Sequence, residues 1–401
     1  MDILILVNGP GETASYVKPA VEALSRLGSG LRIIVVLTPC PYSTGREIEI
    51  AGNIKGVSRV IGVNEFLGWA LWRRPPKNID FSRKGIVVFM GGDLLYGKII
   101  AKRLKYPAIA YSESYAKWPK VYRKFLVPDQ FIFDKFKRSG FPSGQMKVVG
   151  NLMVDGISPL KDKRSAYSNL GLDPNRKLVS FLPGSREFQV QFTINFFAGV
   201  IERMAEKRND CQFAFIISPY LQQRVFERYM LKSGFNVING YIRHKNTAIR
   251  IIDTGQQDAI AASDLVITIP GTNTAEVAAI GTPMIVVFPE ESSQMIPLEG
   301  ACDLVGKLPV LGFLFKKLYV KIKLRMTRFF AIPNIKTGSE VVPELKGHVT
   351  GREIAEKADA MLNDPARLAR ISGQLKASLG GPGASEIVAK EILNEVLHQA
   401  P

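Results

Sequence analysis

Short, uninterrupted runs of apolar residues that end in glycine are the feature that most constrains how this chain folds. ILILVNG (3–9) and GIVVFMGG (85–92) are examples, and neither shows the strict alternation of apolar and polar residues typical of a half-exposed strand. Runs of this kind are typical of strands buried on both faces of a parallel sheet. Between Tyr16 and Leu27 the apolar residues instead recur at helical intervals. The sequence therefore predicts buried strands that alternate with helices.

The alternation occurs twice, on either side of a polar connector near residues 151–175. After the connector, KLVSFLPG (177–184) leads into a predicted helix, and three further strands are predicted in CQFAFIIS, NVING and IRIID. DLVITIPG (264–271) then leads into a predicted helix in TNTAEVAAIG. Two rounds of alternation predict an α/β protein with two doubly wound, Rossmann-like domains that face a cleft, with ligands bound beyond the carboxyl ends of the strands.

The predicted domain boundaries follow from these signals. Residues 1–160 form the first predicted domain and residues 161–380 the second. Residues 381–401, at the GGPGAS break, are predicted to form a helix that packs on the domains. At 401 residues the chain is long enough for two well-buried cores.

Cysteine and histidine content argues against disulfides and metal sites. The three cysteines and three histidines are far apart in the sequence, and no pair has the spacing of zinc ligands. The apolar amino terminus lacks the basic region and cleavage site of a signal peptide, and no stretch reaches the roughly 18 apolar residues of a membrane span. We therefore expect a cytoplasmic protein with reduced thiols and no metal.

The formal net charge of +17 is concentrated in two segments. Residues 98–147 hold twelve Lys and Arg against three acids, and residues 304–339 hold eight Lys and Arg and no acid. Both segments indicate contact with something anionic, such as lipid, nucleic acid or a nucleotide. The basic residues lie among aliphatic ones and no RNA- or DNA-binding module is recognisable, so a nucleic-acid partner is not expected.

A glycine turn after one predicted strand carries residues suited to a phosphate. In FLPGSR, Gly184 lets the backbone turn tightly and Ser185 supplies a hydroxyl. Arg186 supplies a planar guanidinium that matches two phosphate oxygens. The helix that follows would add free N–H groups and the positive end of its dipole. The alternative is an ordinary strand–helix turn with a surface arginine.

A second turn of the same type lies in IPGTNTAEVAAIG. After Gly271, three polar side chains can cap the next helix and turn donors toward a diphosphate. They are Thr272, Asn273 and Thr274. Glu276 lies one turn inside that helix, where a carboxylate can accept hydrogen bonds from the two hydroxyls of a ribose. The alternative for Glu276 is a glutamate that only caps the helix start.

These two turns resemble the nucleotide-sugar half of GT-B glycosyltransferases and, more narrowly, the lipid-A-disaccharide synthase family. The resemblance covers nearly the whole chain and is carried by FLPGSR, SDLVITIPGTNTAEVAAIGTPMIVVF and IPNIKTGSEVVPEL. It implies that Arg186 and the Thr272–Thr274 loop meet the diphosphate of a UDP-sugar. It also implies that Glu276 meets the ribose and that Asn334 lies close to the donor. Gly184, Ser185 and Gly271 would complete this donor site.

The resemblance is weaker in the first half, on the acceptor side. GETASY keeps Gly11 and Glu12 of the family's loop but has Tyr16 where an aspartate is expected. GGDLLYG keeps Asp93 but has Tyr96 at the position of a second aspartate. Inverting transfer needs a base near the acceptor hydroxyl, and it needs no metal if arginine and helix ends stabilise the departing UDP. We predict Asp93 as the base and Glu12 as the second candidate, the alternative for Asp93 being a helix or turn cap.

The segment GFLFKKLYVKIKLRMTRFF would have a basic and an apolar face as a helix. The basic face would hold Lys317, Lys321, Arg325 and Arg328, and the apolar face Phe315, Leu318, Ile322, Met326 and Phe329. This pattern is typical of an interfacial helix attracted to anionic lipid, so we predict that residues 308–331 contact a membrane. The alternative is a core-packed helix with a solvated basic face.

Together these observations predict an inverting glycosyltransferase bound peripherally to the inner face of the cytoplasmic membrane. It would pass an acylated glucosamine from UDP to the hydroxyl of a lipid-linked sugar acceptor and release UDP, without a cofactor. Two alternatives share the UDP loops: an isomerase similar to UDP-N-acetylglucosamine 2-epimerase, and a homologue that binds UDP-sugar or lipid without transfer. The sequence leaves the acceptor, the acyl chains and the formation of a homodimer open.

Overall fold

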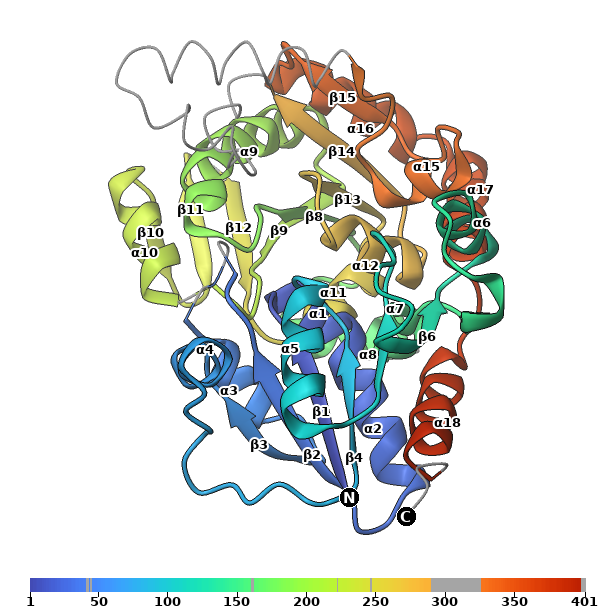
Figure 1. Ribbon diagram of the computed structural model, residues 1–401. Helices are drawn as coiled ribbons and strands as arrows, with labels where there is room; N and C mark the ends of the chain where they lie inside the picture. The colour runs from blue at the N-terminus through green and yellow to red at the C-terminus, as the bar shows by residue number, and fades with distance from the viewer. Residues whose placement is uncertain are drawn as a thin grey trace, which may run out of the picture. The chain divides into compact units, whose positions relative to one another are not determined.

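The computed structural model describes residues 1–40, 43, 45–159, 162–221, 223–245, 247–289 and 326–397. The chain forms two compact units, and Figure 1 follows it through both. The first unit consists of Met1–Ile157 and Gly380–Pro401, and the second of Ser158–Leu379. The boundary therefore falls at residue 157, and the C-terminal helix α18 (Ala384–Leu397) belongs to the first unit, where it packs on α2 (Lys18–Leu27).

The first unit is built on a seven-stranded sheet with the order β3-β2-β1-β4-β5-β6-β7, and every pairing in it is parallel. Its strands are β1 (Asp2–Val7), β2 (Arg32–Leu37), β3 (Val57–Ile61), β4 (Gly85–Phe89), β5 (Ala108–Tyr111), β6 (Tyr122–Val127) and β7 (Met146–Val148). The chain runs from β1 out to β3, then returns to β4 beside β1 and continues to β7. The strand order therefore reverses between β1 and β4.

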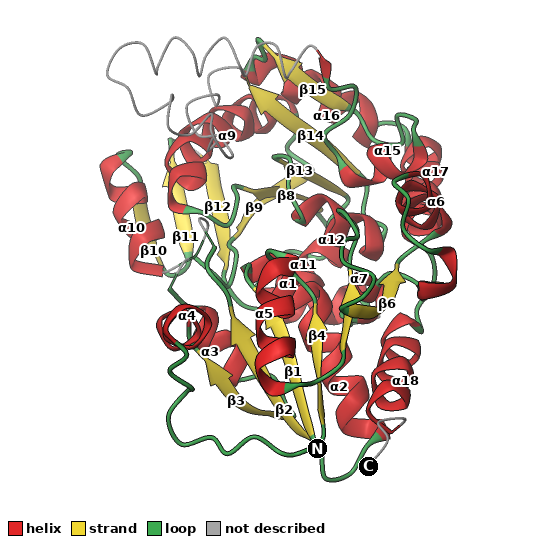
Figure 2. Ribbon diagram, in the orientation of Figure 1, coloured by secondary structure: helices red, strands yellow, loops and turns green. Residues whose placement is uncertain are grey.

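Helices cover both faces of this sheet, as Figure 2 shows. Ile3, Ile5 and Val7 of β1 lie in one hydrophobic cluster with residues of α2 and α18. Leu4 and Leu6 lie in a second cluster, with residues of α4, α5 and α6. Burial on both faces explains why the strands are continuous apolar runs. The remaining helices of this unit are α1 (Pro10–Glu12), η1 (Thr13–Val17), α3 (Glu47–Gly52), α4 (Val63–Trp72), α5 (Leu94–Leu104), α6 (Gln130–Arg138), η2 (Ser143–Gln145) and α7 (Leu152–Asp155).

The second unit is built on an eight-stranded sheet with the order β10-β11-β12-β9-β8-β13-β14-β15. The strands are β8 (Lys177–Leu182), β9 (Cys211–Ile216), β10 (Asn236–Ile238), β11 (Tyr241–His244), β12 (Thr247–Ile252), β13 (Leu265–Thr268), β14 (Met284–Pro289) and β15 (Glu344–Gly347). From β8 the chain first adds β9 and β12 on one side, and later adds β13, β14 and β15 on the other. The order of this sheet therefore reverses between β8 and β13. Two doubly wound α/β units confirm the predicted fold class.

The edge of this sheet differs from the prediction. A strand, β11, lies between the NVING and IRIID runs, and β10, β11 and β12 pair antiparallel. Asn239 and Gly240 join β10 to β11 with φ values of 51° and 76°. Positive φ at both central residues is the geometry of the two-residue hairpin turn that Asn-Gly favours.

The helices of the second unit surround its sheet. They are α8 (Lys163–Leu170), α9 (Glu187–Lys207), α10 (Gln223–Lys232), α11 (Gln256–Ala262), α12 (Asn273–Ile280), α15 (Ile332–Thr337), α16 (Gly351–Leu362) and α17 (Pro365–Leu379). Among them α16 packs on α9 and α17 on α12.

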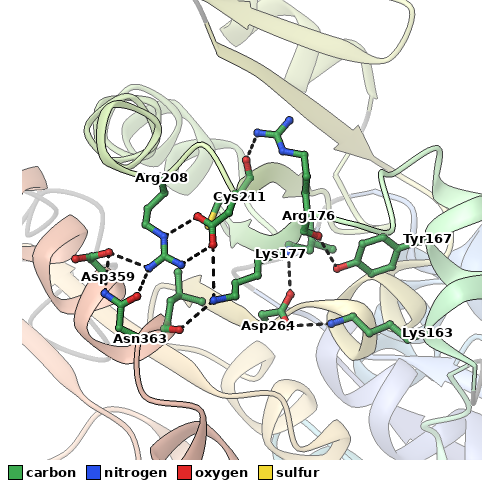
Figure 3. A network of polar contacts seen from close by, with 12 residues as sticks. Lys163, Tyr167, Arg176, Lys177, Arg208, Cys211, Asp264, Asp359 and Asn363 are labelled. Atoms are coloured by element: carbon green, nitrogen blue, oxygen red, sulfur yellow. Dashed lines mark hydrogen bonds and ion pairs between the residues drawn. The ribbon is translucent and has the colours of Figure 1, made fainter.

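A network of charged side chains closes the amino ends of β8 and β9 (Figure 3). Arg208, which is 9% exposed, donates to the two carboxylate oxygens of Asp210 at 2.8 and 2.7 Å. It also donates to Asp359 at 3.0 Å and to Asn363 at 2.6 Å, both on or next to α16. The network therefore ties α16 to the turn between α9 and β9, at the edge of the sheet opposite to the carboxyl ends of these strands.

This network should make the stability of the second unit depend on pH in acid. The hydrogen bond from Arg208 lowers the pKa of Asp210 from 3.8 to about 2. Because the folded pKa is the lower one, the stabilisation is complete above about pH 4 and is lost as the pH falls toward 2. Asp210 is 44% exposed, so we expect only about 1 kcal/mol. In urea titrations between pH 5 and pH 2.5, Asp210→Asn should lose less unfolding free energy than the wild type. Equal losses would contradict this role.

Candidate active site

The two glycine turns of the second unit start from adjacent strand ends. β8 and β13 are parallel neighbours, with Phe181 opposite Ile267 and Leu182 opposite Thr268. The strand order reverses between these two strands. Beyond the carboxyl ends at such a reversal is where doubly wound α/β domains bind ligands. The structure therefore brings FLPGSR and IPGTNTAE together at the position where this topology favours a ligand.

Gly184 is required at the first turn for two reasons. Its φ of +108° is unfavourable for any residue with a side chain. A Cβ atom at this position would also lie 2.6 Å from Oε1 and 2.7 Å from Cβ of Gln189. Gln189 needs this space because its Oε1 accepts hydrogen bonds from the backbone N–H groups of Ser185 (3.1 Å) and Arg186 (3.2 Å). The side chain of Gln189, a residue of α9, therefore closes the turn.

This closure changes which groups of the turn can meet an anion. The N–H groups of Ser185 and Arg186 already donate to Gln189 Oε1, so they are not available to a ligand in this arrangement. The N–H groups of Gln189 and Val190 donate to the Arg186 carbonyl at 3.0 and 3.1 Å. The groups suited to a phosphate are then the N–H groups of Glu187 and Phe188 at the start of α9, and the Arg186 side chain. The Arg186 guanidinium carbon lies 6.0 Å from the centroid of the Phe188 ring.

The second turn is held by its own polar side chains. Asn273 donates through Nδ2 to the hydroxyl of Thr268 and to the carbonyl of Ile269. The Thr274 hydroxyl donates to the carbonyl of Gly271 at 2.8 Å and accepts from the N–H of Ile332, the first residue of α15, at 3.1 Å. Asn273 and Thr274 thus have structural roles in the turn, whereas Gly271 and Thr272 are exposed.

Glu276 lies one turn into α12, as predicted for a ribose contact. Its side chain is partly buried, and burial raises the pKa of its carboxyl. Gln257 at the start of α11 donates to Glu276 Oε1 at 3.5 Å, a long contact, and itself accepts from the N–H of Ser158 at 3.0 Å. A carboxyl in these surroundings is well suited to additional hydrogen-bond donors, such as the hydroxyls of a sugar.

Asn334 is fully buried and uses its whole hydrogen-bonding capacity within the protein. Its Nδ2 donates to the Val342 carbonyl and to Glu344 Oε1, both at 2.8 Å. Its Oδ1 accepts from the N–H groups of Val341 (2.8 Å) and Val342 (3.0 Å). Two donated and two accepted bonds are all that an amide side chain can make. The structure therefore gives Asn334 the role of shaping the loop between α15 and β15.

Glu344 is a residue of this site that the sequence analysis did not single out. Its carboxylate accepts from the N–H groups of Phe330 and Ala331, both at 2.9 Å, as well as from Asn334. It therefore caps the start of α15, next to the Thr274 contact with Ile332. The only sequence signal for it is its position as the acid that closes the IPNIKTGSEVVPEL motif.

In the first unit the predicted acceptor-side residues follow β1 and β4, at the strand reversal of that sheet. Gly11 and Glu12 lie in α1, which leads into the π-helical turn η1, a feature common at functional sites. The side chain of Glu12 turns back over Gly9, where a Cβ would be 2.1 Å from Glu12 Oε2, and its Cγ lies close to Gly91. Oδ1 of Asn8 is buried here and has no hydrogen-bond partner among the described residues.

Asp93 is the N-cap of α5. Its Oδ1 accepts from the N–H of Leu95 at 2.8 Å, and the residue is exposed. The capping alternative is therefore observed, although one cap bond leaves a carboxylate with further acceptor capacity. Tyr96, at the position where the resemblance implies an aspartate, packs against Phe66 with the ring centroids 5.1 Å apart. Tyr96 thus belongs to the hydrophobic packing of the first unit.

Most of the predicted membrane segment lies outside the described residues, including Phe315, Lys317, Leu318, Lys321, Ile322 and Arg325. Arg328 and Phe329 are described, and the Arg328 guanidinium carbon lies 4.9 Å from the Phe329 ring centroid. Within the described ranges, no helix has the length and apolar character needed to cross a membrane. The same ranges hold no group of three or more His, Cys, Asp or Glu side chains that could bind a metal ion.

Comparison with known sequences finds one family repeatedly. A family model described as Lipid-A-disaccharide synthetase matches residues 134–299, which include both glycine turns. The lipid-A-disaccharide synthase of Anaeromyxobacter dehalogenans is 25% identical over 413 residues, covering 98% of this chain and 97% of that protein. The one of Syntrophotalea carbinolica is 25% identical over 418 residues, covering 99% and 96%.

Comparison with solved structures finds the same two-domain architecture. MnaA of S. aureus, solved with UDP, has a TM-score of 0.61 at 12% identity and covers 100% of this chain and 98% of that one. MurG of Acinetobacter baumannii has a TM-score of 0.51 at 12% identity, covering 98% and 99%. At these identities the likeness shows the fold alone. The motifs, the family model and the sequence relatives agree: the chain is similar to lipid-A-disaccharide synthases over nearly its whole length, and its fold is of the GT-B type.

Proposed function

We propose that this glycosyltransferase moves an acylated glucosamine from UDP to the hydroxyl of a lipid-linked sugar and releases UDP. The observation that carries the proposal is the pair of glycine turns at the β8/β13 reversal, with Arg186 on one and Glu276 behind the other. Two solved structures of this fold hold related ligands. MnaA of S. aureus was determined with UDP. UDP-GlcNAc 2-epimerase of Neisseria meningitidis was determined with UDP-GlcNAc; it has a TM-score of 0.59 at 11% identity and covers 98% of this chain and 100% of that one.

On the donor side, each group has a distinct part. The Arg186 guanidinium would neutralise the diphosphate as the bond to the sugar breaks, assisted by the start of α9. Glu276 would accept hydrogen bonds from the ribose hydroxyls. Gly184, Ser185, Gly271 and Thr272 would form the surface against which the diphosphate lies. With arginine and helix ends at the leaving group, the proposed transfer needs no metal ion.

On the acceptor side, the proposed reaction needs a carboxylate base at the β1/β4 reversal. Glu12 and Asp93, both beside that reversal, are the residues predicted from the sequence. The base takes the proton of the acceptor hydroxyl as its oxygen attacks the anomeric carbon, and UDP leaves with the electron pair of the broken C–O bond.

The decisive experiment is mass spectrometry of the lipids formed from UDP-2,3-diacylglucosamine and 2,3-diacylglucosamine 1-phosphate in mixed micelles. We expect a new disaccharide in stoichiometric amounts with UDP. UDP binding without any product would instead favour a homologue that binds without transfer, or a different acceptor. Conversion of UDP-N-acetylglucosamine to its 2-epimer in the same protein preparation would favour the isomerase.

We also propose that the protein binds peripherally at the inner face of the cytoplasmic membrane, where its acylated substrates reside. Besides residues 308–331, the end of α4 offers a suitable surface, with Leu71 61% and Trp72 65% exposed. Arg73 and Arg74 follow directly and are exposed as well. Exposed Trp and Leu beside Arg are typical of side chains that dip into the headgroup region of an anionic bilayer.

The double variant Leu71→Ser/Trp72→Ser should therefore bind less tightly to vesicles that contain anionic lipid. We expect its partition constant in a flotation assay to fall by a factor of about 10 to 100, because two large apolar side chains no longer leave water. Ile48→Ser is a matched control, since Ile48 is 55% exposed but lies between Glu47 and Glu49. Equal binding of the wild type and the double variant would show that this surface does not contribute.

A further inference from the structure

Tyr16 and Glu113 form a tyrosine–carboxylate pair at the carboxyl edge of the first sheet. The hydroxyl of Tyr16 donates to Glu113 Oε1 at 3.1 Å, across 97 residues of sequence. Tyr16 lies in η1 after β1, and Glu113 lies two residues beyond the end of β5. In the strand order β1-β4-β5, the pair therefore spans the end of β4, where Asp93 lies.

The pair is held in place from several sides. The ring of Tyr16 packs against that of Tyr111, with the centroids 5.0 Å apart. Lys135 on α6 donates through Nζ to the backbone carbonyl of Glu113 at 3.2 Å. Further along the same loop, the hydroxyl of Tyr115 accepts from the N–H of Leu94 at 3.5 Å, next to Asp93. The loop that carries Glu113 is thus anchored beside the proposed acceptor site.

The chemistry of the pair differs from that of a structural hydrogen bond. Burial, together with the charges of Glu113 and Glu12, raises the pKa of Tyr16 well above its ordinary value of 10. Tyr16 therefore remains a donor at any physiological pH, and the carboxylate is the partner that can take up a proton. A backbone carbonyl or an amide would satisfy a tyrosine hydroxyl at a lower desolvation cost than a partly buried carboxylate does.

The pair also accounts for the position at which this chain departs from its family. Tyr16 replaces an expected aspartate, and Asp93 is engaged as a helix cap. Glu113 supplies a carboxylate next to Tyr16 from the loop after β5, two strands away from β1 in the sheet. We propose that Glu113 is the base that removes the proton from the acceptor hydroxyl, with Tyr16 as the residue that positions it. This inference rests on the proposed function and names the base of that site.

The proposed step is balanced within the reaction already described. The O–H bond of the acceptor breaks, its proton goes to the Glu113 carboxylate, and its oxygen forms the bond to the anomeric carbon. The C–O bond to UDP breaks and its electron pair leaves with the diphosphate. Among the described residues, Glu12, Tyr111 and Lys135 are charged or titratable groups that face the pair, and Asp129 acts on Tyr111.

The experiment compares Glu113→Gln with Asp134→Asn, a change at an exposed carboxylate on α6, in the full-length protein, using the disaccharide assay in mixed micelles. Glu113→Gln keeps an acceptor for Tyr16 but cannot take a proton, so we expect kcat to fall by a factor of 10² to 10⁴. The KM for the donor, the affinity for UDP and the thermal midpoint should stay close to those of the wild type. Asp134→Asn should keep a kcat close to that of the wild type, because the Asp134 carboxylate is exposed and accepts from Gln130 of its own helix at 2.9 Å.

Two readouts separate a base from a structural residue. Formate should partly restore the activity of Glu113→Ala, because it can occupy the space of the lost carboxylate. In Tyr16→Phe kcat should fall while the KM for the donor stays close to that of the wild type, since the carboxylate loses the hydrogen bond that orients it. A merely structural hydrogen bond predicts neither result.

Each outcome bears on the inference. If the wild type makes disaccharide and Glu113→Gln keeps more than a third of the wild-type kcat, Glu113 is not the base, and the proposed function stands. If Glu113→Gln has a lower thermal midpoint or a lower affinity for UDP, and formate does not restore the activity of Glu113→Ala, then Glu113 has a structural role. A wild type that forms no disaccharide would overturn the proposed function and this inference with it.

Discussion

Replacement of Arg186 by alanine should lower the rate of sugar transfer by a factor of about 10² to 10³, the usual cost of removing one group that stabilises a departing anion. Because Gln189 engages the N–H groups of Ser185 and Arg186, the guanidinium carries much of the positive charge that this turn can offer. The affinity for UDP should fall about tenfold or more, as expected for charge-assisted hydrogen bonds. The thermal midpoint should hardly change, since the backbone of residue 186 and its contact with Gln189 remain.

The measurement combines kcat at saturating donor with calorimetric titration of UDP. Arg186→Lys should lie between alanine and the wild type, because an ammonium keeps the charge but cannot contact two oxygens in one plane. Arg203→Ala is the matched control on the same helix, since Arg203 is exposed and, among the residues that the structure describes, donates only to the Gly199 carbonyl of its own helix, at 2.9 Å. An unchanged affinity of Arg186→Ala for UDP would contradict the donor site proposed here.

Replacement of Asn334 by alanine should lower the free energy of unfolding of the second unit by about 3–5 kcal/mol. The variant leaves two N–H groups, a carbonyl and an oxygen of Glu344 without their partner in a fully buried position. Asn334→Asp should be at least as destabilising although it is nearly the same size, because its second oxygen would face the Val342 carbonyl and Glu344. Urea titration measures the loss directly.

The same variants distinguish two roles for Asn334. If Asn334 shapes the loop, its variants should be less stable, and the protein that remains folded should keep its affinity for the UDP-sugar. If Asn334 contacts the donor, its variants should bind the UDP-sugar less tightly at unchanged stability. Asn175→Ala, on an exposed turn, should change the unfolding free energy by less than about 0.5 kcal/mol and serves as the control.

The two glycine turns illustrate how far sequence reasoning reaches. Gly184 and Gly271 follow apolar strands and precede helices, so local rules placed both turns correctly. That they start from neighbouring strands depends on β13 pairing with β8, although β9 to β12 lie between them in the chain. Alternation of strands and helices predicts a doubly wound sheet, and the family resemblance, confirmed by the comparisons, supplied the rest of this expectation.

Other features could not be predicted because they depend on contacts between distant residues. Gln189 looks like an ordinary helix residue until the folded turn brings its amide to the backbone of Ser185. Tyr16 and Glu113 show no relation in the sequence, because their hydrogen bond requires β1, β4 and β5 to lie side by side. Asn334 was predicted as a donor contact by resemblance, and only the structure shows that all of its hydrogen bonds are made within the protein.

The sequence by itself therefore determined the class of fold and the two strand–turn–helix units, because short-range periodicity and local turn chemistry encode them, and its motifs supplied the resemblance to the lipid-A-disaccharide synthase family. Only the tertiary structure decided which polar groups are already engaged and which carboxylate lies beside Tyr16. Hydrogen bonds are satisfied by whatever partner the packing brings within about 3 Å, and in a sheet whose strand order differs from the chain order that partner is usually far away in the sequence.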